Sequence, residues 1–250
     1  MAVTDANGFT ALPFDVREDL VIAHDRAWDA IRSPGTWLSG VHRLAVAAEI
    51  RHARDHCAVC REIKAALSPN AVNGSHATLG VLSAGEVELV HRVVSDSGRL
   101  TEAWSQSVLA LGVSEGDYVE IIGIVAMVMI MDTFTRALGL VDRPLPSAHA
   151  GEPSRYRPPG AKKQAAWLPI VEPEDTVAAD GPLYPSPKAG YIYRALSSVP
   201  QSVRDYWALA NEHYIPGAFV YQFDKSIRAI TRPQMELVAA RVSALHQCAY

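Results

Sequence analysis

The sequence contains only three cysteines among its 250 residues, at Cys57, Cys60 and Cys248. Three thiols are too few for the disulfide framework that stabilises small secreted domains. The first fifteen residues also lack the cationic start and the apolar run of a signal peptide. We therefore expect no export signal and a cytoplasmic location. In that reducing compartment a close cysteine pair suits redox chemistry better than structural cross-linking.

An excess of one charge is also missing. The formal net charge is −4, from 23 basic and 27 acidic side chains. No stretch interleaves basic with aromatic residues, so we expect no nucleic-acid partner. The apolar run at residues 121–131 is too short to span a bilayer and is bracketed by Glu120 and Asp132. We expect a buried central helix there and no membrane association.

The alternating pattern of a half-buried strand is absent from the sequence, whereas helical periodicity recurs along it. We therefore predict an all-α fold. The predicted helices cover residues 15–32, 43–67, 83–96, 100–111, 114–139, 191–196, 201–212, 219–230 and 231–250. Ten of the sixteen prolines fall within residues 143–187, which predicts an extended connection without regular structure.

The stretch Arg43–Leu67, predicted as one continuous helix, carries the motif Cys57-Ala-Val-Cys60. Residues three apart share a helix face, so the two sulfurs lie close together. A thiolate with a resolving thiol beside it attacks a peroxide or a disulfide and then closes to an intramolecular disulfide. Glu49, two turns before Cys57, and the adjacent His56 are candidate proton-transfer groups.

Two other interpretations of this motif remain open. Free cysteine is among the most buried residue types, so the pair is also consistent with core thiols that carry no chemistry. A zinc site is the second alternative. His52, His56, Cys57 and Cys60 cluster along the predicted helix and offer the nitrogen and sulfur ligands that zinc prefers.

Two further histidines lie outside this helix. His76 follows the loop-forming residues Asn73-Gly74-Ser75, and we interpret it as a surface loop residue. The segment Ser83-Ala-Gly-Glu86 is a capping box that starts the next helix. His91 falls on the apolar stripe of that helix, so we expect it to be a hydrogen-bonded core residue.

The end of the chain resembles a known active-site helix. Residues 236–250, ELVAARVSALHQCAY, resemble that helix in the alkylhydroperoxidase AhpD-like (carboxymuconolactone decarboxylase-like) superfamily. The family motif is a Glu, a Cys twelve residues later, a second Cys after two more residues, and a His four residues beyond. Glu236 and Cys248 have the required separation. Residues 118–139 are similar to the helix that follows this motif. The best match within the superfamily is the group of alkylhydroperoxidase-related (seleno)proteins.

The resemblance implies a duplicated AhpD-like helical bundle. Residues 1–142 would form one copy containing the CxxC pair, residues 143–189 a proline-rich connection, and residues 190–250 the start of a second copy that ends inside its motif. It also implies a homo-oligomer that reduces a peroxide substrate with thiols and is recycled by a thiol reductant. It implies no cofactor.

The family's catalytic residues can be carried over by position. The second copy supplies Glu236 and Cys248, and the first copy supplies Cys57 and Cys60, with Cys60 as the peroxidatic thiol and Cys57 as its partner. On this basis the predicted function is a thiol-dependent peroxide reductase-like oxidoreductase. The alternatives are a non-catalytic AhpD-fold protein that serves oligomerisation or binding, and a zinc-binding structural module.

The first copy departs from the family motif at two positions. Ala45 stands where the motif has Glu, and Lys64 stands where it has His. Glu49, one turn closer to the cysteines, replaces the carboxylate in this interpretation, and His56 shares the proton relay. Lys64 is a cation one turn beyond the second cysteine, a place from which it would lower a thiol pKa.

The motif also places the second Cys of the second copy at position 251, directly after Tyr250. We expect the reading frame to meet a UGA codon that encodes selenocysteine, so that the protein continues through the rest of the second copy. A selenol has a lower pKa than a thiol and is ionised at neutral pH, which suits peroxide chemistry. The alternative is a natural or engineered terminus, and the DNA beyond codon 250 distinguishes the two.

Overall fold

The computed structural model describes residues 5–245, and over that range the regular secondary structure is helical. The α-helices are α1 (Glu18–Arg32), α2 (Gly40–His56), α3 (Ala58–Ala65), α4 (Ala84–Asp96), α5 (Glu102–Ala110), α6 (Glu115–Ala137), α7 (Tyr191–Arg194), α8 (Pro200–His213) and α9 (Arg232–Leu245). No β-strand forms within the described range, where one isolated antiparallel bridge joins Lys162 to Ile170. The predicted all-α class is confirmed.

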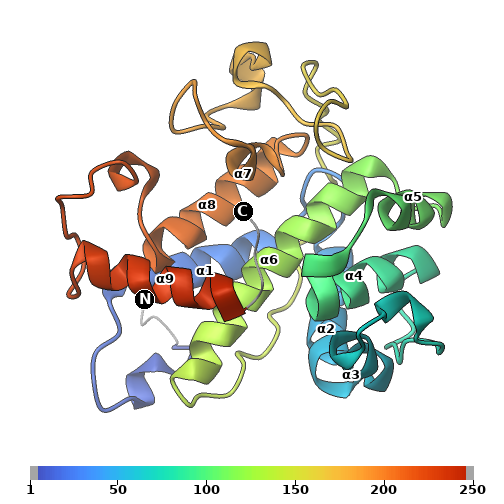
Figure 1. The fold of residues 1–250 in the computed structure, drawn as a ribbon, viewed down its shortest axis with the longest axis horizontal. Helices are drawn as coiled ribbons and strands as arrows, with labels where there is room; N and C mark the ends of the chain where they lie inside the picture. The colour runs from blue at the N-terminus through green and yellow to red at the C-terminus, as the bar shows by residue number, and fades with distance from the viewer. Residues whose placement is uncertain (1–4, 246–250) are drawn as a thin grey trace.

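Helix α6 runs through the middle of the molecule, where it packs against α1, α2, α4 and α8 (Figure 1). Its first turn is capped by Ser114, whose hydroxyl accepts a hydrogen bond from the Asp117 N–H at 3.1 Å. It is long and apolar enough to cross a membrane, but 67% of its most apolar window is buried inside the protein. That burial is typical of a core helix, so the central helix predicted around residues 121–131 is confirmed.

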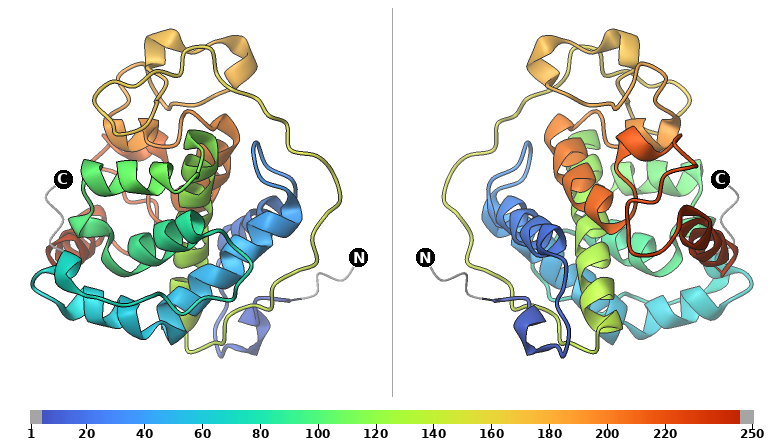
Figure 2. Two further views of the ribbon diagram at one scale, coloured as in Figure 1. Left: turned by 90° about the vertical axis from the view of Figure 1, so that its right-hand side faces the viewer. Right: turned by 90° about the vertical axis from the view of Figure 1, so that its left-hand side faces the viewer.

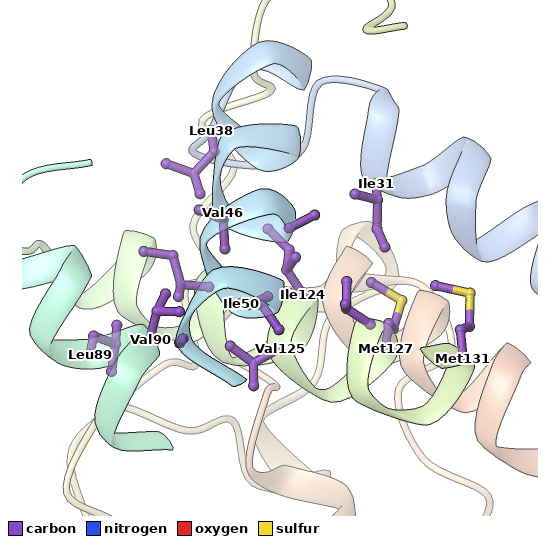
Figure 3. Packing of buried hydrophobic residues seen from close by; sticks show 14 of the residues in the cluster. Ile31, Leu38, Val46, Ile50, Leu89, Val90, Ile124, Val125, Met127 and Met131 are labelled. Atoms are coloured by element: carbon purple, nitrogen blue, oxygen red, sulfur yellow. The ribbon is translucent and has the colours of Figure 1, made fainter. Parts of the chain in front are cut away.

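The main core forms where four helices meet. Figure 3 shows Ile50 of α2, Leu89 and Val90 of α4, and Ile124 of α6 packed together, with Ile31 of α1 nearby. All five side chains are at most 1% exposed. Burying one such aliphatic side chain stabilises the fold by about 1.5–3 kcal/mol. The apolar stripes of these helices therefore account for their mutual orientation.

The proline-rich segment passes along the outside of the helices. Figure 2 shows it leaving the end of α6 and running past the turn between α1 and α2 to the opposite end of the molecule. The His149 N–H donates to the Arg32 carbonyl at 2.8 Å, and the Arg155 N–H donates to the Thr36 carbonyl at 2.8 Å. Two 3₁₀ turns, Pro173–Asp175 and Ala178–Asp180, interrupt it.

Residues after this segment pack onto the earlier helices. α8 contacts α1 and α6, and Val199 and Val203 form a second small core with Val119 of α6. The region predicted to start a second copy is therefore in direct contact with the region predicted to be the first. The duplication itself remains a prediction.

The helix predicted for residues 219–230 is wrong. The structure has a 3₁₀ turn at Gly217–Phe219, followed by turns and bends up to α9. The Arg232 guanidinium donates to the carbonyls of Phe219 at 3.0 Å and Val220 at 2.8 Å. These side-chain bonds satisfy backbone groups that a helix would otherwise pair, so the segment stays irregular.

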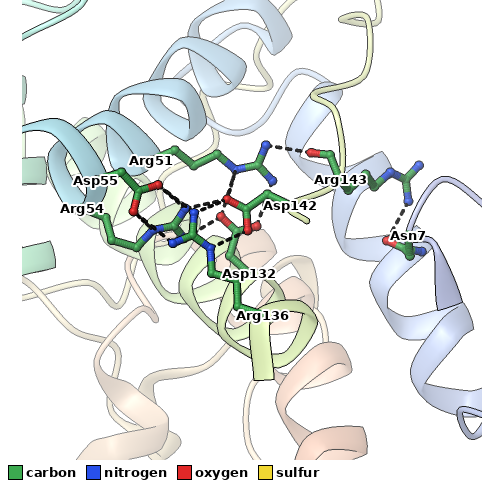
Figure 4. Close-up of polar contacts among 8 residues, drawn as sticks. All are labelled: Asn7, Arg51, Arg54, Asp55, Asp132, Arg136, Asp142 and Arg143. Carbon is green, nitrogen blue, oxygen red and sulfur yellow. Dashed lines mark hydrogen bonds and ion pairs between the residues drawn. The ribbon is translucent and has the colours of Figure 1, made fainter. Parts of the chain in front are cut away.

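Ion pairs join the C-terminal end of α2 to the C-terminal end of α6 (Figure 4). Asp132, which is 2% exposed, accepts hydrogen bonds from Arg51 and Arg54, each with a shortest N–O distance of 2.8 Å. Arg136 pairs with Asp55 at 2.7 Å. Because Asp55 lies two residues before Cys57, this network holds the chain immediately before the cysteine pair.

Candidate thiol and histidine site

The helix predicted over residues 43–67 is interrupted at Cys57. α2 ends at His56, α3 begins at Ala58, and Cys57 between them is extended, with φ −83° and ψ 110°. The Cys57 sulfur accepts a hydrogen bond from the Cys60 N–H at 3.3 Å and caps α3. The prediction of one continuous helix was wrong because the sulfur side chain starts a new helix. Cys57 consequently lies at a helix N-terminus, which favours a thiolate.

Two histidines that are distant in sequence meet the two sulfurs. His76 Nδ1 lies 3.5 Å from the Cys57 Sγ and 3.5 Å from the Cys60 Sγ. His91 Nδ1 lies 3.1 Å from the Cys60 Sγ. All four atoms are within 4.8 Å of one another. His76 comes from the loop before α4 and His91 from α4, so long-range packing assembles this cluster.

Each histidine is supported on its far side by a glutamate. His91 Nε2 lies 2.8 Å from Glu49 Oε1, and His76 Nε2 lies 3.3 Å from Glu88 Oε2. An ionised carboxylate is only an acceptor, so each Nε2 carries the proton and donates it. His91 Nδ1 then presents a lone pair to the Cys60 sulfur, and His76 Nδ1 faces both sulfurs, where it accepts a hydrogen bond when the ring is neutral and donates one when the ring is protonated.

The glutamates are themselves held in place. Glu49 is fully buried, and its second oxygen accepts a hydrogen bond from the Leu79 N–H at 3.1 Å. Glu88 accepts a hydrogen bond from the Trp104 indole N–H at 2.8 Å. Glu49 therefore orients His91 and also anchors the loop that carries His76.

The two thiols have opposite pKa shifts. Burial raises the pKa of Cys57, but hydrogen bonds from Cys60, His76 and the Ala77 N–H outweigh it, so the pKa of Cys57 falls below its usual value. Burial raises the pKa of Cys60 strongly, and the neighbouring Cys57 sulfur raises it further. Cys57 is therefore the more acidic thiol.

The two histidines also differ. Burial lowers the pKa of His91 more than Glu49 raises it, so His91 is neutral at physiological pH. Burial acts against charge on His76 as well, but Glu88 and Cys57 outweigh it and the pKa of His76 is raised. The cluster therefore pairs a neutral buried imidazole with a more basic one near the surface.

Access to the sulfurs is restricted. Cys57 is 0% exposed and Cys60 is 3% exposed. An open pocket of about 630 Å³ lies on the outer side of His76, with Val59, Leu82 and Glu88 among its lining residues. His76 lines this pocket and also contacts the sulfurs, so its side chain lies between the pocket and the cysteine pair.

The structure brings together only some of the residues that the sequence suggested. Glu49, Cys57 and Cys60 lie in the cluster. His56 is exposed and its ring faces His52 at a centroid distance of 5.4 Å. Over residues 5–245, the group of close metal-ligating atoms at the cysteines includes neither of these two histidines.

Glu236, which was proposed for a second motif, lies away from the cluster. Glu236 is on α9, where it pairs with Arg232 at 2.6 Å and accepts a hydrogen bond from the Tyr214 hydroxyl at 2.9 Å. Cys248 lies outside the described residues. Lys64, the cation predicted to lower a thiol pKa, is exposed on α3 and is not among the groups that shift either thiol.

Sequence reasoning missed the roles of both histidines. The interpretation of His76 as a surface loop residue was wrong, because its side chain is only 10% exposed and contacts both sulfurs. The prediction that His91 is a hydrogen-bonded core residue was confirmed, but its contact with Cys60 was not foreseen. The sequence signal for this pair was weak, because the chain has nine histidines and the spacing singles out neither His76 nor His91.

Comparisons with protein-family models, with curated proteins and with solved structures return no match. The resemblance to the AhpD-like superfamily therefore remains a prediction, and the function has to be argued from the site itself.

Proposed function

We propose that this protein is a thiol oxidoreductase that reduces a hydroperoxide with Cys57 and closes a disulfide to Cys60. The observation that carries the proposal is the cluster of two sulfurs and two imidazole Nδ1 atoms within 4.8 Å of one another. Nucleophilic thiol chemistry needs a stabilised thiolate, a second thiol and a proton acceptor. This cluster has a candidate for each.

Cys57 is the attacking thiol in this proposal. Its sulfur is at the start of α3 and accepts the Cys60 N–H, and the raised pKa of Cys60 makes Cys60 the poorer nucleophile. The Cys57 thiolate attacks one peroxide oxygen, so that an S–O bond forms and the O–O bond breaks. The other oxygen leaves with a proton as an alcohol, and Cys57 becomes a sulfenic acid. This order reverses the roles that the family resemblance implied.

Cys60 then resolves the sulfenic acid. Its proton passes to His91 Nδ1, which lies 3.1 Å from the sulfur, and Glu49 stabilises the resulting imidazolium. The Cys60 thiolate attacks the Cys57 sulfur, the S–S bond forms, and the S–O bond breaks to release water. A thiol reductant restores both thiols by exchange.

The pocket beside His76 gives the substrate a place to bind. Its lining combines apolar side chains such as Val59, Ile63 and Leu82 with the polar groups of His76 and Glu88. An organic hydroperoxide has an apolar body and a polar reacting end, which this lining suits. Because both sulfurs are buried behind His76, the loop that carries His76 has to move for the peroxide to reach Cys57.

Peroxide turnover tests the proposal. The protein should consume an alkyl hydroperoxide in the presence of a small dithiol, and Cys57→Ser should abolish consumption. Cys60→Ser should retain a single turnover and leave Cys57 as a sulfenic acid that a 1,3-dione reagent traps. Glu62→Gln, at an exposed position of α3, serves as the control and should keep the activity. Equal turnover by Cys57→Ser and the unmodified chain would overturn the assignment of Cys57, and no turnover above that of the dithiol alone would leave the non-catalytic interpretation.

A further inference from the structure

We propose that the reduced protein binds one Zn²⁺ through Cys57, Cys60, His76 and His91. This ligand set differs from the one predicted from the sequence, which used His52 and His56. Binding does not depend on the proposed peroxide chemistry, because it needs only the two thiolates and the two imidazole nitrogens of the reduced chain.

The distances between the ligand atoms fit a tetrahedral zinc ion. Zinc binds sulfur at about 2.3 Å and imidazole nitrogen at about 2.0–2.1 Å, which places S and N about 3.5 Å apart at tetrahedral angles. His76 Nδ1 is 3.5 Å from each sulfur, and His91 Nδ1 is 3.1 Å from the Cys60 sulfur. The other three separations among the ligand atoms are at most 4.8 Å, so small side-chain shifts bring the four atoms onto one ion.

The surroundings of the histidines fit zinc as well. A zinc-binding imidazole usually donates its other N–H to a carboxylate, which fixes the tautomer and makes the ligand more basic. Both histidines have this arrangement, His91 with Glu49 at 2.8 Å and His76 with Glu88 at 3.3 Å. A fortuitous contact between a thiol and a histidine does not require a carboxylate behind each ring.

The chemistry of the donor set selects the metal. Two thiolates and two imidazoles in a tetrahedral arrangement are typical of zinc, whereas magnesium and calcium require oxygen ligands. All four positions are filled by protein atoms, from Cys57 at the N-cap of α3, from α3 itself, from the loop before α4 and from α4. Such a closed site is structural rather than hydrolytic, because no position is left for water. A bound ion would join the loop to both helices.

Zinc would also regulate the thiols, and this consequence rests on the proposed function. A bound ion occupies both thiolates and the His91 nitrogen that accepts the Cys60 proton, so it slows peroxide attack, which then proceeds through chains from which the ion has dissociated. When a hydroperoxide does oxidise the pair, the two thiolates lose two electrons to the O–O bond. With two protons from solvent the products are the disulfide, an alcohol and water. The disulfide no longer binds zinc, which is released.

Metal titration of the reduced Cys248→Ser chain under anaerobic conditions tests the binding. Co²⁺ should bind one to one and give thiolate-to-cobalt charge-transfer bands with the intense visible bands of a tetrahedral site, and Zn²⁺ should displace it. His76→Asn and His91→Asn should each remove the tetrahedral spectrum or weaken Zn²⁺ binding at least 10-fold. Glu88→Gln should weaken it about 10- to 100-fold.

A matched double variant separates this ligand set from the alternative one. His52→Asn combined with His56→Asn should leave both the spectrum and the affinity unchanged, since neither ring belongs to the cluster. Loss of binding in that variant, or the absence of thiolate-to-cobalt bands in the intact reduced chain, would overturn the proposal.

The outcomes also distinguish this proposal from the proposed function. Peroxide turnover without cobalt–thiolate bands would support the proposed oxidoreductase and overturn the zinc site. Binding of Co²⁺ and Zn²⁺ as described would support the zinc site. If the same chain forms no disulfide with peroxide after complete chelation, the proposed oxidoreductase is overturned. Release of zinc on addition of a hydroperoxide, followed with a chromogenic chelator, is expected only if both are correct.

Discussion

His91 joins a buried carboxylate to a thiol: its Nε2 lies 2.8 Å from Glu49 Oε1 and its Nδ1 lies 3.1 Å from the Cys60 sulfur. The three residues come from α2, α4 and α3, and all three are buried. A proton that leaves Cys60 therefore has its shortest route to His91, and the carboxylate stabilises the charge that appears on the imidazole. The reactivity of the cysteine pair should depend on this contact.

Replacing Glu49 with Gln should slow disulfide formation about 100-fold, within the range usual for the loss of a proton-transfer group. The amide is nearly isosteric but cannot stabilise an imidazolium. Stopped-flow measurement of the second step, the decay of the sulfenic acid, checks this. Glu62→Gln, an exposed glutamate of α3, is the matched control and should react at the original rate. An unchanged rate in Glu49→Gln would exclude a role for the Glu49 carboxylate in this proton transfer.

Cys57 should be alkylated by iodoacetamide before Cys60 in the reduced, metal-free Cys248→Ser chain. The Cys57 sulfur accepts a backbone hydrogen bond at the start of α3, and its pKa is lowered, whereas burial and the adjacent sulfur raise the pKa of Cys60. Peptide mass spectrometry after a short pulse of reagent measures the order. Preferential labelling of Cys60 would restore the roles that the family resemblance implied.

The cysteine pair and Glu49 could be predicted from the sequence, whereas the two histidines that contact the sulfurs could not. The CxxC spacing indicated that the sulfurs are close, and the helical period brought Glu49 into the same region. His76 and His91 lie sixteen and thirty-one residues beyond Cys60, and no helical or strand period relates such separations. The capping box at Ser83 fixed where α4 begins, but the angle at which α4 meets α2 depends on tertiary packing.

Breaking the buried charge network should destabilise the fold. Asp132 is 2% exposed and accepts hydrogen bonds from Arg51 and Arg54, so Asp132→Asn leaves two guanidinium groups short of their counter-charge. We expect a loss of about 3 kcal/mol in the free energy of unfolding, measured by urea denaturation. Asp29→Asn, which removes an exposed pair with Arg32, should cost less than about 1 kcal/mol.

A result in which Asp132→Asn and Asp29→Asn cost the same would contradict the view that burial makes the Asp132 network important. The double variant Asp132→Asn with Arg51→Gln provides a further check. Arg51 has already lost its ion pair with Asp132 when Asp132 is replaced by Asn. The losses of unfolding free energy caused by the two substitutions should therefore be less than additive.

The stability should fall on acidification because two histidines in contact, the buried His24 and the half-buried His213, are held without charge. His24 Nε2 and His213 Nε2 lie 2.9 Å apart between α1 and α8. Burial, followed by the neighbouring charges, lowers the pKa of His24 to about 3, and burial lowers that of His213 to about 4. Between these values and the ordinary value near 6.5, the unfolded chain binds protons that the folded chain excludes. The stability is therefore present above pH 6.5 and is lost as the pH falls.

His213→Gln should make this pH dependence shallower, because only His24 must then stay neutral. With about 1.4 kcal/mol per pKa unit, His213 accounts for a difference of about 3 kcal/mol between neutral pH and pH 4. Unfolding free energies measured across this range check the value. His149→Gln, an exposed histidine, should keep the original slope. Equal slopes in all three proteins would exclude the buried pair as the cause.

Helix-forming segments with regular apolar stripes were predicted well. The errors occur where a side chain makes a hydrogen bond to a backbone group that the predicted helix would have paired. At Cys57 the sulfur accepts the Cys60 N–H and divides one expected helix into α2 and α3. After Gly217 the guanidinium of Arg232 takes the carbonyls of Phe219 and Val220. Neither replacement has a periodic signature, because each depends on one side chain meeting one backbone group in the folded chain.

The most direct test of the central claim is the mass of the peptide that contains both thiols. Reduced, metal-free Cys248→Ser protein is treated with one equivalent of an alkyl hydroperoxide, alkylated and digested. We predict that the peptide with Cys57 and Cys60 loses two hydrogens and resists alkylation until it is reduced. One equivalent of alcohol should be formed from the hydroperoxide. Recovery of this peptide with both thiols alkylated, and of the hydroperoxide intact, would contradict the account.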